Sequence, residues 1–82
     1  MSPEELLVLL GWIPQEPWQR RTVEDLVTEL GTWADVKTTR RWFRRPQPTL
    51  NRRTPLEALR LAKLPGDPIL SELRTLAKNP AP

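Results

Sequence analysis

The sequence predicts an all-α protein, a small single-domain bundle of about five short helices. Helix start and stop signals recur along the 82 residues: Ser or Thr caps, prolines at first helical positions, and glycines after apolar segments. No segment shows the alternation of apolar and polar residues that is typical of a half-buried strand. A chain of this length supports one domain, which buries roughly 60% of its unfolded surface.

The first helix is expected to begin at SPEE, residues 2–5, where a cap, a first-turn proline and a capping-box acid coincide, and to end at Gly11. Its LLVLL run, residues 6–10, is apolar around the whole helix. Packing inside so small a domain accounts for two or three of these side chains. The others predict contact with a partner or with a second copy of the chain, a homo-oligomer.

Residues 12–21, WIPQEPWQRR, hold two prolines and are expected to form an irregular crossing. The second helix is predicted to start at Thr22 and to end at Gly31. One face of it is apolar: Val23, Leu26, Val27 and Leu30. The third helix is predicted to start at Thr32, with Asp35 at the capping-box position, and to run toward Arg45. It must end before Pro46, because a proline disfavours the helical conformation of the residue before it.

The fourth helix is predicted from TPLE, residues 54–57, the strongest cap in the chain, to the neighbourhood of Pro65 and Gly66. The fifth starts at Asp67 and Pro68. Its apolar face comprises Ile69, Leu70, Leu73, Leu76 and Ala77. We divide the chain into an N-terminal helix with the crossing (1–21), a helical domain (22–79) and a tail (80–82).

Charge is distributed unevenly. Residues 1–36 hold seven acids and two bases, residues 37–56 hold seven bases and no acid, and the whole chain has a net charge of +3. The basic segment is a candidate nucleic-acid contact through Lys37, Arg40, Arg41, Arg44, Arg45, Arg52 and Arg53. Such a run is equally typical of a solvated face; the functional interpretation is an electropositive surface for phosphate or for an acidic partner.

The second and third helices, joined through Gly31, can also be interpreted as a helix-turn-helix, with the basic residues on the helix that would enter the major groove. The spacing from Gly31 to the apolar anchors Val36 and Trp42 fits that motif poorly. Any DNA binding is therefore expected to be electrostatic and only weakly sequence-specific.

The composition argues against catalysis and against a metal or cofactor. The chain has no cysteine, histidine or tyrosine, and its two serines, Ser2 and Ser71, have no base to activate them. A signal peptide begins with basic residues, whereas here acids precede the apolar run at residues 6–10. This run is also much shorter than a membrane helix, which needs about 20 apolar residues. We therefore expect a soluble cytoplasmic protein that is not an enzyme and has no membrane partner.

Residues 23–77 resemble the toxin-binding domain at the C-terminus of Xre/MbcA/ParS-type bacterial antitoxins. In that family a Trp-Leu-x-x-Pro segment leads to a Leu, a Gly-rich turn, a Thr/Ser-Pro-Leu-Glu helix start, a Gly and a final amphipathic helix. The matching positions are Trp42, Pro46 or Pro48, Leu50, Thr54, Pro55, Leu56, Glu57, Ala58, Leu59, Gly66, Ile69 and Leu73. At the turn, this chain has Asn51, Arg52 and Arg53 where the family usually has Gly-Gly or Gly-Arg.

The resemblance implies an antitoxin that neutralises a RES-domain toxin, an NAD-consuming enzyme, by packing its C-terminal helix at the toxin's active site. The expected partner contacts are Ile69, Leu73, Arg74, Leu76 and Lys78, although the apolar stripe of Ile69, Leu73 and Leu76 can also dock on the domain's own core. The cations of Arg74 and Lys78 either occupy the space of the NAD phosphates or favour the negative end of the helix dipole. The positions expected to build the fold are Trp42, Pro48, Leu50, Thr54, Pro55, Leu56, Leu59 and Gly66. Two alternatives stay open: a small basic DNA-binding regulator, and a phage- or host-encoded inhibitor that docks on an unrelated protein.

Overall fold

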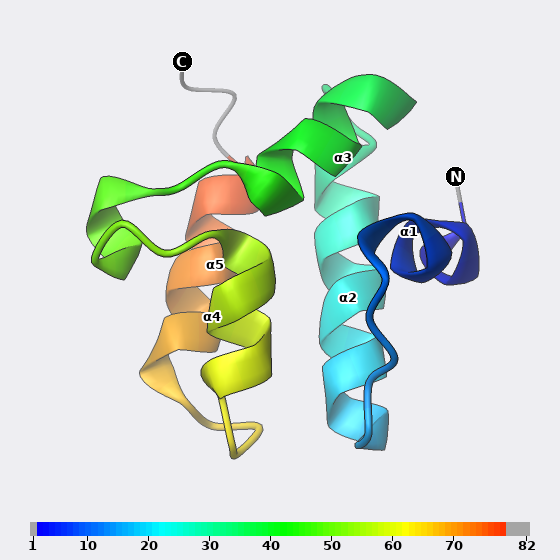
Figure 1. Cartoon of the computed structure of the whole chain (residues 1–82). Helices are drawn as coiled ribbons and strands as arrows, with labels where there is room; N and C mark the ends of the chain where they lie inside the picture. Colours follow the sequence, from blue (N-terminus) through cyan, green and yellow to red (C-terminus); the bar gives the residue numbers. More distant parts are fainter. Residues whose placement is uncertain (1, 79–82) are drawn as a thin grey trace.

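The computed structural model describes residues 2–78, which form five α-helices and one short 3-10 helix (Figure 1). In chain order these are α1 (Pro3–Leu10), α2 (Pro17–Leu30), α3 (Val36–Arg44), η1 (Pro48–Leu50), α4 (Pro55–Leu61) and α5 (Pro68–Lys78). Within this described part there is no strand, only an isolated antiparallel bridge between Gln47 and Arg53. The predicted all-α bundle is confirmed.

All five helices contribute to one core. α2 and α5 pack side by side and run in the same direction, with α4 against α5 and α1 against α2 (Figure 1). α3 packs on α4 and on α1. The fully buried side chains of largest volume include Phe43, Leu6, Leu26, Leu59 and Leu73, so residues from both ends of the chain meet in the same interior. Burial of such side chains is the main contribution to the stability of the fold.

Several predicted caps are confirmed. The Ser2 hydroxyl accepts a hydrogen bond from the Glu5 amide at 3.2 Å, and Gly11 closes α1 at a φ of 69°. At the start of α4, the Thr54 hydroxyl accepts from the Glu57 amide, and the Glu57 carboxylate accepts from the Thr54 amide, both at 3.1 Å. This reciprocal capping box satisfies two amides that have no partner inside the helix.

Two predicted helix starts are wrong. α2 begins at Pro17, not at Thr22, because a proline at the first helical position starts a helix rather than breaking it. The Gln19 side chain accepts hydrogen bonds from the amides of Gln15 and Glu16, which fixes this start. α3 is capped by Asp35 itself, whose carboxylate accepts from the Thr38 amide at 2.7 Å, so Thr32 does not begin the helix.

The predicted division at residue 21 falls inside α2, and the side chains on both of its sides share one core. α4 also ends earlier than predicted, at Leu61, and residues 62–67 connect it to α5. The start of α5 agrees with the prediction, since the Asp67 carboxylate accepts from the Ile69 amide at 3.0 Å. Asn79 and the predicted tail, residues 80–82, lie outside the described residues.

Candidate functional site

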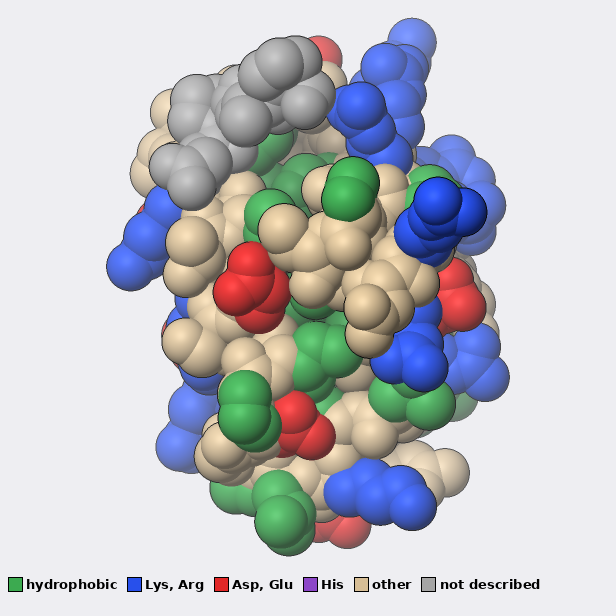
Figure 2. Space-filling model, turned by 90° about the vertical axis from the view of Figure 1, so that its left-hand side faces the viewer, with side chains coloured by type: hydrophobic (Ala, Val, Ile, Leu, Met, Phe, Trp, Pro, Cys, Tyr) green, Lys and Arg blue, Asp and Glu red, His purple; other side chains and the backbone are tan. Residues whose placement is uncertain are grey.

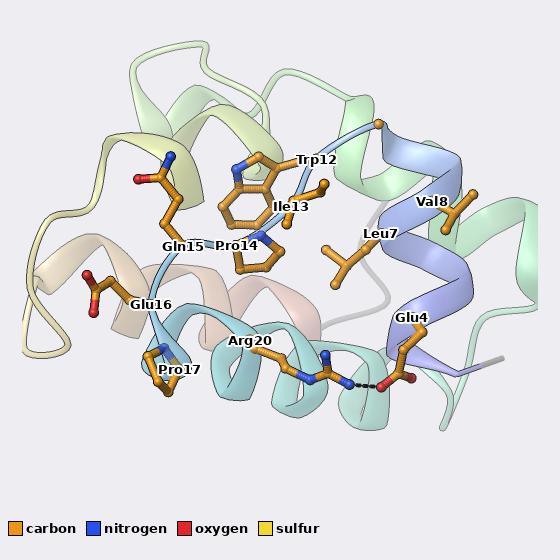
Figure 3. A pocket seen from close by; sticks show the side chains of 11 residues that line it. Glu4, Leu7, Val8, Trp12, Ile13, Pro14, Gln15, Glu16, Pro17 and Arg20 are labelled. Atoms are coloured by element: carbon orange, nitrogen blue, oxygen red, sulfur yellow. Dashed lines mark ion pairs between the residues drawn. The ribbon is translucent and has the colours of Figure 1, made fainter.

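An open groove of about 710 Å³ lies where α1, the crossing segment and the start of α2 meet (Figure 3). Most of its lining is apolar: Leu7, Val8, Trp12, Ile13, Pro14 and Pro17. We call it the N-terminal groove. Two of these side chains face solvent almost completely, Val8 at 80% and Ile13 at 85% exposure.

The apolar run of α1 explains one wall of this groove. Leu6, Leu7 and Leu10 are buried, whereas Val8 and Leu9 are exposed. A helix with apolar residues on every side can turn only one face to the core, so the remaining side chains must lie outside it. The expectation that packing accounts for two or three of the five residues is confirmed.

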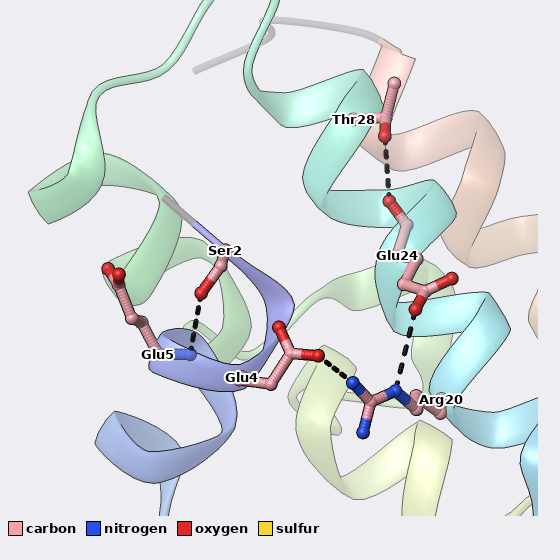
Figure 4. A network of polar contacts seen from close by, with 6 residues as sticks. All are labelled: Ser2, Glu4, Glu5, Arg20, Glu24 and Thr28. Carbon is pink, nitrogen blue, oxygen red and sulfur yellow. Dashed lines mark hydrogen bonds and ion pairs between the residues drawn. The ribbon is translucent and has the colours of Figure 1, made fainter.

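A polar contact joins the two helices at the rim of the groove. The Arg20 guanidinium is ion-paired with Glu4 of α1, and its Nε lies 3.6 Å from a carboxylate oxygen of Glu24 (Figure 4). These side chains are about half exposed, so each pair stabilises the fold by no more than about 1 kcal/mol. The contact links α1 to α2 and gives the mainly apolar groove a charged edge.

A second candidate site is one side of α3. Positions three or four residues apart share a helix face, and five cations occupy such positions: Lys37, Arg40, Arg41, Arg44 and, at the C-cap, Arg45. We call these residues the α3 basic face. All five are exposed, while Thr39, Trp42 and Phe43 on the other side of α3 are buried.

No carboxylate in residues 2–78 forms an ion pair with a cation of the α3 basic face. Arg44 instead donates a hydrogen bond from Nη2 to the Leu9 carbonyl at 3.0 Å, which ties α3 to α1. Figure 2 shows Lys and Arg side chains gathered toward the upper right of the face in view.

Two carboxylates that lie near cations, Asp35 and Glu57, cap helices. The hydrogen bond from the Thr38 amide lowers the pKa of Asp35, and the charges of Lys37 and Arg41 lower it further. The hydrogen bond from the Thr54 amide likewise lowers the pKa of Glu57, with smaller contributions from Arg53 and Arg60. Both groups are held as carboxylates by backbone amides.

The loop after α3 continues the positive surface. Gln47 and Arg53 form an antiparallel bridge, with the Gln47 amide donating to the Arg53 carbonyl at 3.0 Å. Asn51 and Arg52 at its tip adopt left-handed conformations, with φ of 56° and 65°. This conformation costs a non-glycine residue about 1–2 kcal/mol, although asparagine tolerates it better than arginine does. The side chains of Arg52 and Arg53 are exposed.

Most of the motif residues carry the fold, as expected. Trp42, Leu50, Pro55 and Leu59 are buried, and the rings of Trp42 and Phe43 meet edge to face at 4.9 Å. Leu56 is half-buried, Thr54 forms the capping box, and Pro48 opens η1 with its side chain exposed.

Gly66 differs from this group. It lies exposed in the α4–α5 connection, and a Cβ added there would meet no atom within 4 Å. Neither crowding nor a positive φ requires a glycine at this position, so the structure does not support the expected structural role of Gly66.

The structure separates the predicted contacts on α5 into two groups. Leu73 is fully buried, so it docks on the domain's own core, the alternative expected from its apolar face, and it is not presented to a partner. Ile69 and Leu76 are half-buried against the same core. Arg74 lies 3.6 Å from Asp25 of α2, and Lys78 is exposed at the end of the helix.

The helix-turn-helix interpretation is not supported by the packing. Residues 31–35 connect α2 to α3, but α3 packs mainly on α4 and α1 rather than on α2. In a helix-turn-helix the recognition helix is positioned by the helix before it. The cations therefore lie on a helix at the edge of the bundle, without the usual supporting partner.

Two informative residues had no assigned role in the sequence. The Trp33 indole donates a hydrogen bond to the Ala77 carbonyl at 2.8 Å, which ties the turn before α3 to the last turn of α5. Ile13, between Trp12 and Pro14, is the most exposed large apolar side chain described.

These features define the class of the molecule: a small all-α protein with an exposed apolar groove and a cationic helix face. Comparison with family models, with curated proteins and with solved structures finds no match. Within residues 2–78, no helix has the length and apolar character needed to cross a lipid bilayer.

Proposed function

We propose that this protein is an antitoxin-like protein-binding module whose partner docks in the N-terminal groove. The observation that supports docking most strongly is the pair Val8 and Ile13, both at least 80% exposed beside an apolar groove. Burying an exposed side chain of this size stabilises a complex by about 1.5–3 kcal/mol. A groove between two protein segments also suits the docking of an amphipathic helix from a partner.

The identity of the partner rests on the resemblance to the toxin-binding domain, which implies a RES-type, NAD-consuming toxin. The buried positions of Trp42, Leu50 and Leu59 are consistent with that resemblance, since these motif residues were expected to build the fold. The resemblance places the neutralising contact on α5, where Arg74 and Lys78 reach the surface. The N-terminal groove adds a second, apolar surface that lies outside residues 23–77.

These two surfaces are well separated. The N-terminal groove borders the start of α2, at the lower end of Figure 1, whereas α5 ends at the upper end. A partner that seats in the groove therefore need not touch Lys78. Variants of each surface therefore distinguish docking in the N-terminal groove from docking on α5.

The test is co-expression with a RES-type toxin, with bacterial growth as the measurement. We expect the wild-type chain to restore growth and the double variant Val8→Asp, Ile13→Asp to fail, because two charges would be buried against apolar partner atoms. The matched control is Leu61→Asp, Leu64→Asp, which alters two exposed leucines outside the groove. This control is expected to restore growth.

Full growth with the Val8→Asp, Ile13→Asp variant would contradict docking in the groove. If the Arg74→Glu, Lys78→Glu variant then fails to restore growth, the contact lies on α5 instead. Circular dichroism of each purified variant shows whether a loss of function reflects loss of the fold.

A further inference from the structure

We propose that the α3 basic face, together with Arg52 and Arg53, binds the sugar-phosphate backbone of duplex DNA. This inference is independent of partner docking, because none of these residues lines the N-terminal groove. Three observations support it: the linear array of the cations, the unfavourable local positions of Lys37 and Arg52, and the scarcity of exposed apolar side chains between the cations.

The cations form a linear array. At a rise of 1.5 Å per residue, the positions from Lys37 to Arg45 span about 12 Å along α3. Measured along the axis of duplex DNA, each strand has one phosphate every 3.4 Å, so an array of this length that lies parallel to the axis faces about three or four phosphates of one strand. Four of the five cations are arginines, whose planar guanidinium groups bind phosphate oxygens in a bidentate manner.

The loop extends the array beyond the end of α3. The bridge between Gln47 and Arg53 folds the chain back on itself two residues after Arg45. Leu50, buried at 3% exposure, anchors this loop to the core. Arg52 and Arg53 are therefore presented from an anchored turn that follows directly on the basic face, not from a free segment.

Two of these cations occupy positions where the local backbone favours a different residue type. Lys37 lies in the first turn of α3, where the helix dipole favours an anion, not a cation. Arg52 holds a left-handed conformation, at φ 65°, that glycine would adopt without strain. Neither side chain forms an ion pair with a carboxylate in the described part of the chain, so only the weaker, unpaired attraction between Lys37 and the Asp35 carboxylate offsets this cost. Departures from local preference without a compensating contact are typical of functional surfaces.

The surface between the cations favours nucleic acid over an acidic protein. Interfaces between proteins are more than half apolar, with charged residues depleted at the centre. Interfaces with DNA are much more positively charged. Val36, at 52% exposure, is the single large apolar side chain that α3 exposes.

The test uses the anisotropy of a fluorescent, mixed-sequence DNA duplex titrated with the full chain. Each phosphate neutralised contributes about −0.9 to the slope of log affinity against log salt. Five such contacts would weaken binding about 500-fold between about 50 and 200 mM salt. We expect a dependence at least this steep for the wild-type protein.

The informative variant is Lys37→Gln, Arg52→Gly, because both changes remove a charge and relieve a local conflict. It is expected to unfold at the same or a higher temperature than wild type. Its binding should be weaker, and its salt slope should be shallower by about 1.8. The variant Asn51→Gly, which relaxes the same turn and keeps every charge, is expected to bind DNA like the wild type.

The control for net charge is the variant Arg21→Gln, Lys63→Gln. Arg21 lies near the start of α2, and Lys63 lies in the connection after α4. These segments lie at the opposite end of the molecule from α3 (Figure 1). We expect this control to leave affinity and slope unchanged. An equal loss in the control, or no loss in the Lys37→Gln, Arg52→Gly variant, would overturn the assignment of the surface.

Competition experiments identify the ligand. Poly-glutamate that displaces the duplex at equal charge concentration would overturn the preference for phosphate. Tighter binding to single-stranded than to duplex DNA would overturn the choice of duplex. Absence of binding at low salt would overturn the proposal as a whole, and it would leave docking in the N-terminal groove unaffected.

Discussion

The Phe43→Ala variant is expected to lose about 3–5 kcal/mol of unfolding free energy, as is typical of a buried aromatic residue replaced by alanine. Phe43 is fully buried and has the largest volume of the fully buried side chains described. A domain of this length has only about 4–12 kcal/mol of stability in total. The variant should therefore be marginally folded or unfolded.

The measurement is thermal unfolding followed by circular dichroism. For a domain of this size, about 1 kcal/mol shifts the midpoint by 4–8 °C, so a decrease of about 12 °C or more is expected. The matched control is Arg40→Ala, an exposed position on the same helix, which should shift the midpoint by only a few degrees. A Phe43→Ala protein as stable as this control would show that α3 does not pack on the core as described.

The Trp33→Ala variant is expected to lose about 2–3 kcal/mol and to loosen the last turn of α5. The Trp33 indole donates a hydrogen bond to the Ala77 carbonyl and packs against the core with its half-buried ring. A hydrogen bond of this kind stabilises a fold by about 1 kcal/mol, and the packing of the ring accounts for the rest.

Hydrogen exchange of the amides in α5 is the measurement for Trp33. We expect faster exchange over residues 74–78 in Trp33→Ala, while α1 exchanges as in the wild type. The variant Trp33→Phe keeps most of the packing and removes the donor, so it should lose only about 1 kcal/mol. If the amides of residues 74–78 exchange no faster in Trp33→Ala than in the wild type, the indole does not secure the end of α5.

The fold could be predicted from short-range chemistry. The caps at Ser2, Thr54 and Asp67 act within three residues, so sequence reasoning placed the starts of α1, α4 and α5 correctly. It failed for α2 because Pro17 was interpreted as a break rather than as a first helical residue. It failed for α3 because Thr32 and Asp35 are both good caps, and the choice between them depends on the turn that brings Trp33 to Ala77.

The candidate sites were predicted only in part. The charge pattern of the sequence identified the basic residues, and helical spacing places five of them on one face. The ion pairs of Arg20 with Glu4 and of Arg74 with Asp25 could not be predicted, because they join different helices. Leu73 lies on the predicted apolar face of α5, so its burial agrees with the amphipathic pattern, whereas its assignment as a partner contact depended on the resemblance. The left-handed conformations of Asn51 and Arg52 were not predicted, because glycine, the usual sequence signal for a positive φ, is absent at both positions.

The most direct test of docking in the N-terminal groove is a calorimetric titration of a purified RES-type toxin with the purified chain. We predict saturable binding by the wild type and by Leu61→Asp, Leu64→Asp. The Val8→Asp, Ile13→Asp variant should bind at least about 30-fold more weakly, which corresponds to the loss of at least about 2 kcal/mol expected for central apolar contacts. Equal affinity of the groove variant and the wild type, or no binding by the wild type, would contradict the proposed function.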